Sequence, residues 1–361
     1  MTEPICMAIS GGIDSLVAAH LLTDQGADLI GIHFITGFET GSDETDPMAA
    51  AAARIRPVSE QLNIPVHVVD ARQPFYTAVI RYFVDAYHQG HTPNPCLQCN
   101  ARIKFGWLKT VAARYGATCL ATGHYVQTCQ TQQGVSLICQ GADQKKDQSY
   151  FLGFLSPQQI RTSRFPLGAL TKADIKAYAA RHHLVPVQKK ESQDICFITG
   201  RSYREFLENT GNTSAGPGPV VDTTGRVLGQ HKGLQGYTVG QRRGLGIPGP
   251  EPYYVLSLDT KTNQLVIGFK AECYQTSCRV RGLQWHTHPS DEPLFVRLRY
   301  SHQPVRCEIH TPQPDPHTAV LRFAEPQLSV TPGQGAVFYD THGCVIGAGW
   351  IDQTVSESRH R

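Results

Sequence analysis

The sequence lacks the long hydrophobic runs and leader patterns that mark membrane-bound or exported proteins. None of its apolar runs approaches the roughly 18 residues that a membrane-spanning helix requires. The first apolar segment begins at Ile5, which leaves no room for a signal or transit peptide. Internal repeats and low-complexity segments are also missing. These absences predict a globular protein with no membrane partner, located in the cytoplasm.

The sequence also lacks a second pair of closely spaced cysteines. Its 11 cysteines are an odd number, and only Cys96 and Cys99 form a Cys-x-x-Cys. Without a secretory signal, such cysteines are typical of reduced thiols, metal ligands or redox catalysts rather than of a disulfide framework. A structural zinc at this pair would need two further ligands. Eight cysteines have no chemical motif around them and are expected to fill the core or lie at the surface: Cys6, Cys119, Cys129, Cys139, Cys273, Cys278, Cys307 and Cys344.

A strong net charge is missing, but the charge is unevenly distributed. The chain has 361 residues, which suggests two or three domains, and a formal net charge of +3. Residues 1–100 contain 4 Lys/Arg against 11 Asp/Glu, whereas residues 101–200 contain 13 against 5. The basic excess follows the Cys-x-x-Cys, where a polyanion could bind. Solvated helix faces would produce a similar excess, so charge alone leaves nucleic-acid binding open.

A Gly-rich loop follows the first predicted strand. The apolar run 5–9 stops at Ser10-Gly11-Gly12, and a helical pattern of apolar residues resumes after Asp14. Two glycines let the backbone approach a ligand closely, and the positive end of the next helix favours an anion. The Gly-Lys-Ser/Thr of a Walker loop is missing. An ordinary strand-to-helix turn is the alternative, but the hexamer 10–15 resembles the Ser-Gly-Gly-x-Asp-Ser loop of the PP-loop ATP pyrophosphatases, and this resemblance favours a loop that binds nucleotide phosphates.

Strand and helix patterns alternate over the first two hundred residues. This alternation predicts an α/β domain in which helices cover both faces of a parallel sheet. Ligands bind such sheets beyond the carboxyl ends of the strands, so the Ser10 loop, Phe34 and Gly123-His124 are expected to converge on one site. After the first strand and helix, the predicted strands are 27–35, 64–70 and 118–122, and the predicted helices are 48–62, 75–88 and 103–115.

The composition changes after about residue 200, where Gly, Pro and short β-rich runs replace the Ala-rich helices. These runs predict a small barrel or sandwich. We therefore divide the chain into a catalytic α/β domain (1–200), a β-rich central domain (201–275) and a C-terminal β-barrel (276–361). Strands near the end of the chain are predicted at 294–300, 305–310, 318–323 and 336–339.

Three cysteines have neighbours that suggest chemistry. Two prolines stiffen the approach to Cys96 and Cys99 and keep them off the preceding helix. A Cys-x-x-Cys at a helix start can lower a thiol pKa and so provide a nucleophile or a soft-metal ligand. Cys196 follows Lys189 and Lys190, whose charges would favour a thiolate. Three such thiols in a chain with a nucleotide loop indicate thiol chemistry or metal binding more strongly than any one of them would.

Several segments together resemble the tRNA-specific 2-thiouridylase family, a branch of the PP-loop ATP pyrophosphatases that thiolates the wobble uridine of certain tRNAs. The resemblance runs in the family's order over nearly the whole chain, and it implies a PP-loop sheet, a central domain that binds tRNA and a C-terminal barrel. The matching segments are Ile9–Ser15, Thr92–Pro95 with Cys99-Asn100, Ala121–Tyr125, Lys146–Leu152, Asp194–Ile198, Tyr237–Ile247 and Pro332–Tyr339.

The resemblance implies roles for individual residues. Cys99 would be the nucleophile and Cys196 would carry a persulfide. Asn94, Pro95 and Cys96 would contact the target base. ATP, with Mg²⁺, would be bound by Ala8, Ile9, Ser10, Gly11, Gly12, Ile13, Asp14, Ser15, Phe34 and Gly123. Phe34 stands where many members have Met, so only its backbone role is carried over. The tRNA would be bound by His124, Lys146, Asp147, Gln148, Arg299, Tyr300 and Gln334.

The tRNA contacts have independent support from residue chemistry. Lys146 and Arg299 suit phosphate groups, and Tyr300 could stack on an unstacked base. Modification of an anticodon base also requires its displacement into a pocket. The implied activity is the 2-thiolation of wobble uridine in Lys, Glu and Gln tRNAs, and the implied partners are tRNA and a sulfur donor, either a relay protein linked to a cysteine desulfurase or free sulfide.

Two routes for the sulfur remain open. In the first, ATP adenylates O2 of uridine, the Cys196 persulfide attacks C2, and Cys99 releases the sulfur to leave a Cys99–Cys196 disulfide. In the second, Cys96, Cys99 and Cys196 hold a 4Fe-4S cluster whose fourth iron binds hydrosulfide. The second route arises because better-known members carry an aspartate where this chain has Cys96. No metal ligand is assigned with certainty.

Two other classes of protein share part of this pattern. A different PP-loop adenylating synthetase would share the nucleotide loop but would not explain Cys99 together with Cys196. A non-enzymatic tRNA-binding sulfur carrier would need no ATP loop, and binding of tRNA without ATP or AMP release would favour it.

Overall fold

The first domain is built around a five-stranded parallel sheet, as predicted. The computed structural model describes residues 3–39, 45–188, 195–198, 202–210, 216–289, 292–311 and 315–354. The sheet order is β3-β2-β1-β4-β7, and every neighbouring pair is parallel. The strands are β1 (Ile5–Ala8), β2 (Leu29–Ile35), β3 (Val66–Asp70), β4 (Cys119–Ala121) and β7 (Ser163–Arg164).

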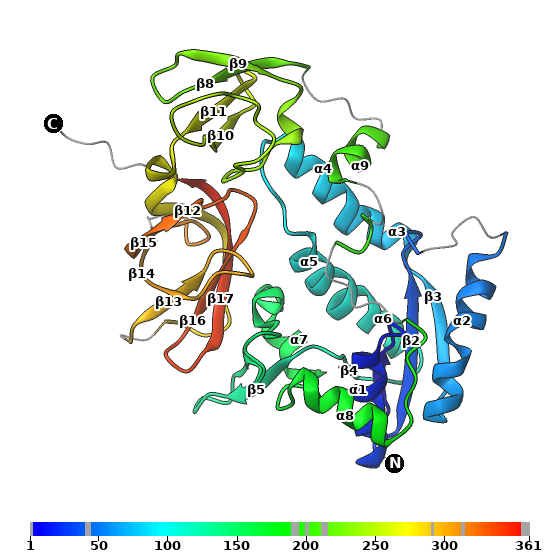
Figure 1. Ribbon diagram of the computed structural model, residues 1–361. Helices are drawn as coiled ribbons and strands as arrows, with labels where there is room; N and C mark the ends of the chain where they lie inside the picture. The colour runs from blue at the N-terminus through cyan, green and yellow to red at the C-terminus, as the bar shows by residue number, and fades with distance from the viewer. Residues whose placement is uncertain are drawn as a thin grey trace.

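Helices cover both faces of this sheet (Figure 1). The adjacent residues Cys6 and Met7 on β1 are both fully buried and belong to different hydrophobic clusters, because successive side chains of a strand point to opposite faces. The Met7 face packs against α1 and α8, and the Cys6 face against α6. The helices are α1 (Ile13–Asp24), α2 (Pro47–Leu62), α6 (Leu108–Ala113), α7 (Pro157–Arg161) and α8 (Lys172–Arg181).

Two helical runs interrupted by π-helical turns connect β3 to β4. The predicted helix 75–88 is confirmed as α3 (Arg72–Phe75), the π-helical η1 (Tyr76–Ile80) and α4 (Arg81–His88). The predicted helix 103–115 begins earlier, as α5 (Pro95–Gln98) and the π-helical η2 (Cys99–Trp107), and ends as α6. Such π-helical turns are frequent at functional sites, and η2 begins at Cys99.

The second domain is small and β-rich. Its four-stranded sheet has the order β10-β11-β8-β9, and a cluster around Val255 and Ile267 forms its core. Helix α9 (Tyr203–Asn209) precedes it, with a Ser202–Glu205 capping box at its start. The strands are β8 (Gly218–Val221), β9 (Val227–His231), β10 (Tyr254–Asp259) and β11 (Gln264–Gly268); the short 3₁₀ helix η4 (Leu234–Gly236) follows β9 and η5 (Lys270–Cys273) follows β11.

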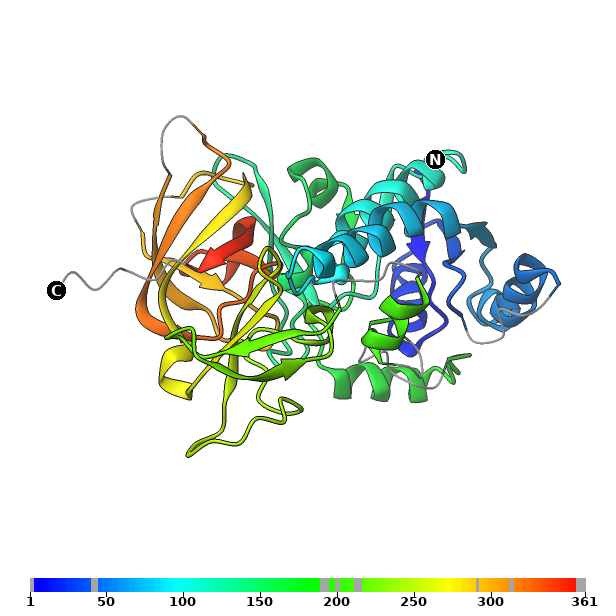
Figure 2. The ribbon, with the colours of Figure 1, turned by 90° about the horizontal axis from the view of Figure 1, so that it is seen from above.

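The C-terminal domain is a closed six-stranded β-barrel. Strand β12 pairs with both β15 and β17, which closes the sheet order β12-β15-β14-β13-β16-β17 into a ring. Viewed from above, the barrel and the parallel-sheet domain occupy opposite ends of the molecule (Figure 2). The strands are β12 (Tyr274–Trp285), β13 (Leu294–Arg297), β14 (Val305–His310), β15 (Ala319–Leu328), β16 (Gly335–Tyr339) and β17 (Cys344–Thr354).

A hairpin from the first domain extends the barrel sheet, and this feature was not predicted. Strands β5 (Val126–Gln130) and β6 (Ser136–Gln140) pair with each other, and β6 pairs with β17 through Cys139 opposite Cys344. The short 3₁₀ helix η3 (Ser149–Leu152) follows in the chain. The hairpin is short and its strand partner lies about two hundred residues away in the sequence, so no local pattern predicts the pairing. None of the described helices is both long and apolar enough to cross a membrane.

Candidate functional site

Hydrogen bonds of the Ser10 and Ser15 hydroxyls stabilise the Gly-rich loop after β1. The Ser10 backbone N–H donates to Ser15 Oγ at 3.2 Å, and the two hydroxyl oxygens lie 3.1 Å apart. Ser15 Oγ donates to the Gly12 carbonyl at 3.0 Å. Gly11 has a φ of +85°, a conformation that L side chains rarely adopt. The loop therefore needs glycine at this position to turn from strand to helix.

The start of α1 is arranged to receive an anion. Gly12 is its N-cap and supplies no side-chain acceptor, so the helix has no capping side chain of its own. Ser10, at the tip, is exposed. In a 12-residue helix the first N–H groups and the helix dipole favour a phosphate at this end.

A lysine that the sequence did not indicate reaches this loop from α8. Lys172 Nζ lies 2.7 Å from Asp14 Oδ1 and 3.0 Å from Oδ2, and the Tyr125 hydroxyl donates to Asp14 Oδ1 at 2.6 Å. Lys172 is the first residue of α8, whose Thr171–Asp174 capping box defines the helix start. No motif near Lys172 reveals this contact, because it depends on how α8 packs beside α1.

Gly123 lies against the same loop. A Cβ atom at Gly123 would lie 3.0 Å from the carbonyl carbon of Asp14 and 3.0 Å from the Ser15 nitrogen, tighter than nearly all real Cβ contacts. The carboxyl end of β4 thus meets the Gly-rich loop, as the sheet topology predicts. Phe34, at the end of β2, is half-buried and packs against both the sheet core and the aromatic cluster beneath Cys99.

The structure brings Cys96, Cys99 and Cys196 into electrostatic range of one another. Cys96 lies on α5 and Cys99 one turn later, so both thiols share a face of the helix. Asn94 is the N-cap of α5 and Pro95 its first residue, which explains why the helix begins there. Cys196 joins them from a segment about a hundred residues further along the chain.

Phe197 anchors the Cys196 segment. Its side chain is only 3% exposed and packs edge-on against Phe83, with ring centroids 5.2 Å apart. Phe38 and Phe206 lie 5.8 and 5.2 Å from the same ring. The aromatic pocket therefore holds Cys196 beside Cys99, which packs against the same cluster. Lys189 and Lys190, expected to favour the Cys196 thiolate, lie outside the described residues.

The expected lowering of the pKa at the Cys-x-x-Cys thiols, Cys96 and Cys99, is wrong for this structure. Burial raises the pKa of Cys99 to about 12 and that of Cys196 to about 11, and the neighbouring thiols add to both shifts. Burial also raises the pKa of Cys96. The Lys104 ammonium opposes all three shifts. For Cys99 the desolvation of the half-buried thiol outweighs the effect of the helix start, whereas the Cys196 residue is exposed at the surface.

The barrel contacts the loop that leads to these cysteines. Thr92 donates its N–H to the Pro332 carbonyl at 2.8 Å, and Gln334 Nε2 donates to the Thr92 carbonyl at 2.8 Å. Gln334, a predicted tRNA contact, therefore lies beside the Cys-x-x-Cys approach. Arg299, another predicted tRNA contact, donates to the carbonyls of Val239 and Ser329 at 3.2 and 2.9 Å and so connects the central domain to the barrel.

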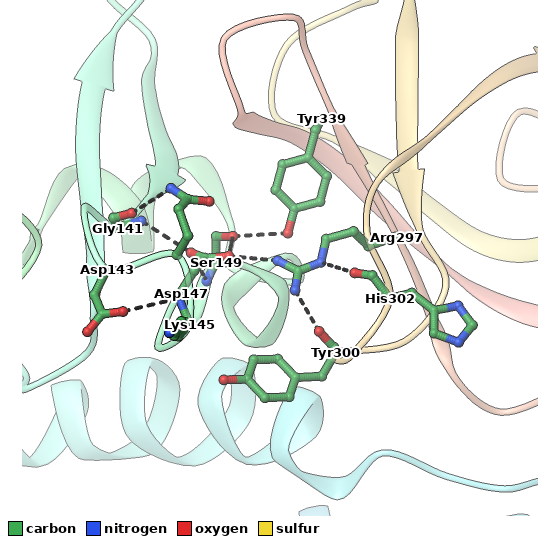
Figure 3. A network of polar contacts seen from close by, with 10 residues as sticks. Gly141, Asp143, Lys145, Asp147, Ser149, Arg297, Tyr300, His302 and Tyr339 are labelled. Carbon is green, nitrogen blue, oxygen red and sulfur yellow. Dashed lines mark hydrogen bonds and ion pairs between the residues drawn. The ribbon is translucent and has the colours of Figure 1, made fainter. Parts of the chain in front are cut away.

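Asp147 lies in a buried network between the first domain and the barrel (Figure 3). Its Oδ2 lies 2.6 Å from Arg297 Nη1 and accepts from the Ser149 hydroxyl at 2.9 Å. Arg297 also donates to the Tyr300 carbonyl at 2.6 Å, while Tyr339 and Ser149 share a hydrogen bond of 3.0 Å. A direct contact between the predicted Asp147 carboxylate and tRNA would require this network to open.

The remaining predicted tRNA residues differ in exposure. Lys146 and Gln148 are half-buried, and Gln148 Oε1 accepts from the Tyr125 N–H at 3.0 Å. Tyr300 packs on Phe151 with ring centroids 4.4 Å apart. His124 is buried between Phe105 and Phe165, and this burial lowers its pKa well below the ordinary value. His124 thus serves the packing of the site in this conformation.

The expectation for the other cysteines is wrong for Cys139 and Cys344, whereas the other six are free thiols as expected. Cys6, Cys273, Cys278 and Cys307 are buried and Cys119 is half-buried. Cys139 and Cys344, however, form a disulfide between β6 and β17, and Cys129 Sγ lies 3.0 Å from Cys139 Sγ and 3.4 Å from Cys344 Sγ. The sequence did not reveal this group because it depends on the unpredicted hairpin.

The chain matches three family models in succession. These are the tRNA methyl transferase HUP domain over residues 3–200, the tRNA methyl transferase PRC-barrel domain over 204–269 and the aminomethyltransferase beta-barrel domain over 275–351.

Curated proteins named tRNA-specific 2-thiouridylase are similar over nearly the whole chain. The protein of Desulfosudis oleivorans is 45% identical over 353 residues, an alignment that covers 96% of this chain and 94% of that protein. The protein of Geobacter metallireducens is 40% identical, with 98% of each chain covered. The protein of Syntrophotalea carbinolica is 41% identical, with 96% of this chain and 98% of that protein covered.

Proposed function

This chain belongs to the tRNA-specific 2-thiouridylase family of sulfurtransferases, and we propose that it uses ATP to replace O2 of the wobble uridine of tRNA with sulfur. The observation that carries this proposal is that Cys99 and Cys196 come within electrostatic range of each other in the same domain as a Gly-rich loop that suits phosphates. The expected substrates are the Lys, Glu and Gln tRNAs.

The loop side of the site suits activation of the uridine. O2 of uridine attacks the α-phosphorus of ATP, pyrophosphate leaves, and the base becomes an O2-adenylate. The N–H groups at the start of α1 bind the phosphates, and Asp14, oriented by Lys172 and Tyr125, lies where it can contact a phosphate-bound cation. Bound Mg²⁺ would supply charge neutralisation for the leaving pyrophosphate.

The thiol side suits sulfur transfer. The outer sulfur of a Cys196 persulfide attacks C2 and AMP leaves. Cys99, as thiolate, then attacks Sγ of Cys196, which breaks the persulfide bond and leaves the sulfur on C2 and a Cys99–Cys196 disulfide. A thiol reductant takes the disulfide back to two thiols. Asn94, Pro95 and Cys96, at the start of α5, are the proposed contacts of the base.

The raised pKa values of the Cys99 and Cys196 thiols favour their protonated forms in this conformation. With pKa values of about 12 and 11, Cys99 and Cys196 are protonated at neutral pH, so they are poor nucleophiles before substrates bind. We infer that binding of tRNA and ATP changes the surroundings of Cys196. Among the described residues, Lys104 is a cation that opposes these shifts in all three thiols, and it would stabilise the thiolate that forms.

A 4Fe-4S route is the second candidate, because Cys96 shares electrostatic range with both other thiols. Cys96 and Cys99 are half-buried and Cys196 is exposed, and three thiols within electrostatic range of one another suit the ligand chemistry of such a cluster. Bound there, it would offer an open iron for hydrosulfide. In this route Cys96, Cys99 and Cys196 act as ligands and no protein disulfide forms.

One experiment tests the proposal and separates the routes. Protein purified without oxygen is assayed for iron and labile sulfide, and then for 2-thiouridine in tRNA with ATP and either a persulfide donor or free sulfide. We expect Cys99→Ser and Cys196→Ser to bind ATP but to lose thiolation, whereas Cys119→Ser stays active. The cluster route is supported if the wild-type protein uses free sulfide and the Cys96→Ser variant loses its iron. Activity in iron-free protein supports the persulfide. Full activity of either serine variant would contradict both routes.

A further inference from the structure

A second group of three cysteines lies where the first domain meets the barrel. Cys129 comes from β5, Cys139 from β6 and Cys344 from the start of β17, three strands that are neighbours in one sheet. Cys139 lies directly opposite Cys344 in the register, and Cys129 is diagonal to Cys139, since Cys139 faces Gln127. The three side chains therefore project from the same face of the sheet.

The three sulfur atoms are close enough to share one ion. They all lie within 4.8 Å of one another, with Cys129 Sγ at 3.0 Å from Cys139 Sγ and 3.4 Å from Cys344 Sγ. Four-coordinate zinc with bonds of about 2.3 Å places its sulfur ligands roughly 3.8 Å apart. Once the Cys139–Cys344 disulfide is open, small rotations of the side chains suffice to reach this spacing.

A carboxylate near the three sulfur atoms favours a bound cation at this place. The Asp340 carboxylate lies in electrostatic range of Cys129, and together with burial it raises the pKa of the Cys129 thiol. Asp340 is itself held in place, because its Oδ1 accepts from the N–H groups of His342 and Cys344 at 2.9 and 2.8 Å. Cys344 is buried and the other two cysteines are half-buried, so the ion would be shielded on one side and reachable on the other.

We propose that Cys129, Cys139 and Cys344 form a three-thiolate site for a soft or borderline metal ion such as Zn²⁺, which joins the β5–β6 hairpin of the first domain to the C-terminal barrel. The disulfide form is the oxidised, metal-free state of this site. Its fourth coordination position is open to water or an external thiol. The site is separate from the three thiols of the proposed active site and does not depend on the proposed function.

Conversion of the disulfide form to the metal-bound form requires two electrons and the release of three protons. A phosphine reductant supplies two electrons and is oxidised to its phosphine oxide, with the oxygen taken from water. The Cys139–Cys344 bond breaks, and the two protons of that water complete the two thiols. One Zn²⁺ then displaces the protons of the three thiols, which are released to the buffer, so metal binding is tighter at higher pH.

The test uses the full chain with Cys96, Cys99 and Cys196 all replaced by serine, so that the active-site thiols cannot bind metal. This protein is reduced with a phosphine, freed of reductant without oxygen, and titrated with Co²⁺ and Zn²⁺. We expect one ion per chain and sulfur-to-cobalt charge-transfer absorption. Adding Cys129→Ser, Cys139→Ser or Cys344→Ser is expected to weaken binding by at least about 10–100-fold. Cys119→Ser, a half-buried cysteine on β4, is the matched control and retains binding.

A second measurement avoids any effect of these substitutions on folding. In the reduced wild-type protein, one equivalent of Zn²⁺ is expected to protect the peptides that carry Cys129, Cys139 and Cys344 from alkylation, as read by mass spectrometry. The proposal is overturned if the reduced protein binds no ion, if binding survives the loss of Cys129, or if the three cysteines stay reactive with Zn²⁺. In each of these cases Cys139 and Cys344 would form a disulfide beside the Cys129 thiol, and the three residues would bind no metal.

Discussion

Lys172 and Asp14 are joined across the Gly-rich loop, with Lys172 Nζ 2.7 Å from Asp14 Oδ1 and 3.0 Å from Oδ2. The two residues are 158 positions apart in the sequence. The pair connects the first turn of α8 to the first turn of α1, so it positions the one acidic side chain of the loop.

Replacement of Lys172 is expected to weaken the use of ATP. In Lys172→Met the Asp14 carboxylate loses the ammonium group that orients it, so its contact with the phosphate-bound cation weakens. Because Asp14 is one-third exposed, we expect a loss of about 1–3 kcal/mol, or roughly tenfold to a hundredfold in kcat/KM for ATP. Lys176→Met, on an exposed position of the same helix, is the control. Equal kinetics for the two variants would show that Lys172 only shapes the helix start.

Replacement of Phe197 is expected to release the Cys196 segment. Phe197→Ala removes the ring that packs against Phe83 and Phe206, a core truncation that typically costs about 3–5 kcal/mol. The loss of packing destabilises mainly the Cys196 segment. Thiolation therefore falls while ATP still binds, and iodoacetamide modifies Cys196 faster. Phe197→Leu keeps most of the packing and is the control. Unchanged alkylation of Cys196 in Phe197→Ala would contradict the anchoring role.

Removal of the Lys104 charge is expected to move the pH dependence of thiol reactivity upward. Lys104 lowers the pKa of Cys99 and Cys196 against the larger effect of burial, so its loss raises both pKa values further. At a given pH below about 11, Lys104→Gln should therefore have less thiolate and slower alkylation than the wild type. Lys109→Gln is the control, since Lys109 bonds to Thr162 and not to these thiols. A pH profile of alkylation that does not shift would contradict this role.

Loss of Arg297 is expected to destabilise the contact between the first domain and the barrel. Arg297→Met leaves the buried Asp147 carboxylate without its partner at 2.6 Å, and removal of one member of a buried pair typically costs about 3–5 kcal/mol. Urea unfolding measures the loss. The double variant Arg297→Met/Asp147→Asn should recover part of it, because no charge is then left unpaired. Arg279→Met breaks a more exposed pair with Asp352 and should cost less.

The sequence alone determined the features that depend on local pattern. The Gly-rich loop, the parallel alternation of the first domain and the barrel strands follow from periodicity and turn residues, so their outlines were predicted. Helix boundaries near the site were not, since α5 begins at Pro95 and continues through a π-helical turn that no periodicity marks. The family motifs also selected Cys99 and Cys196 as partners, although about a hundred residues separate them.

Tertiary structure alone decided the environment of those residues. Burial reversed the expected direction of the Cys99 pKa shift, because desolvation depends on packing from distant segments. The ion pair of Asp14 with Lys172 and the group formed by Cys129, Cys139 and Cys344 likewise arise from contacts between remote elements. Local chemistry identifies which residues can react, whereas the folded neighbourhood sets their charge, exposure and partners.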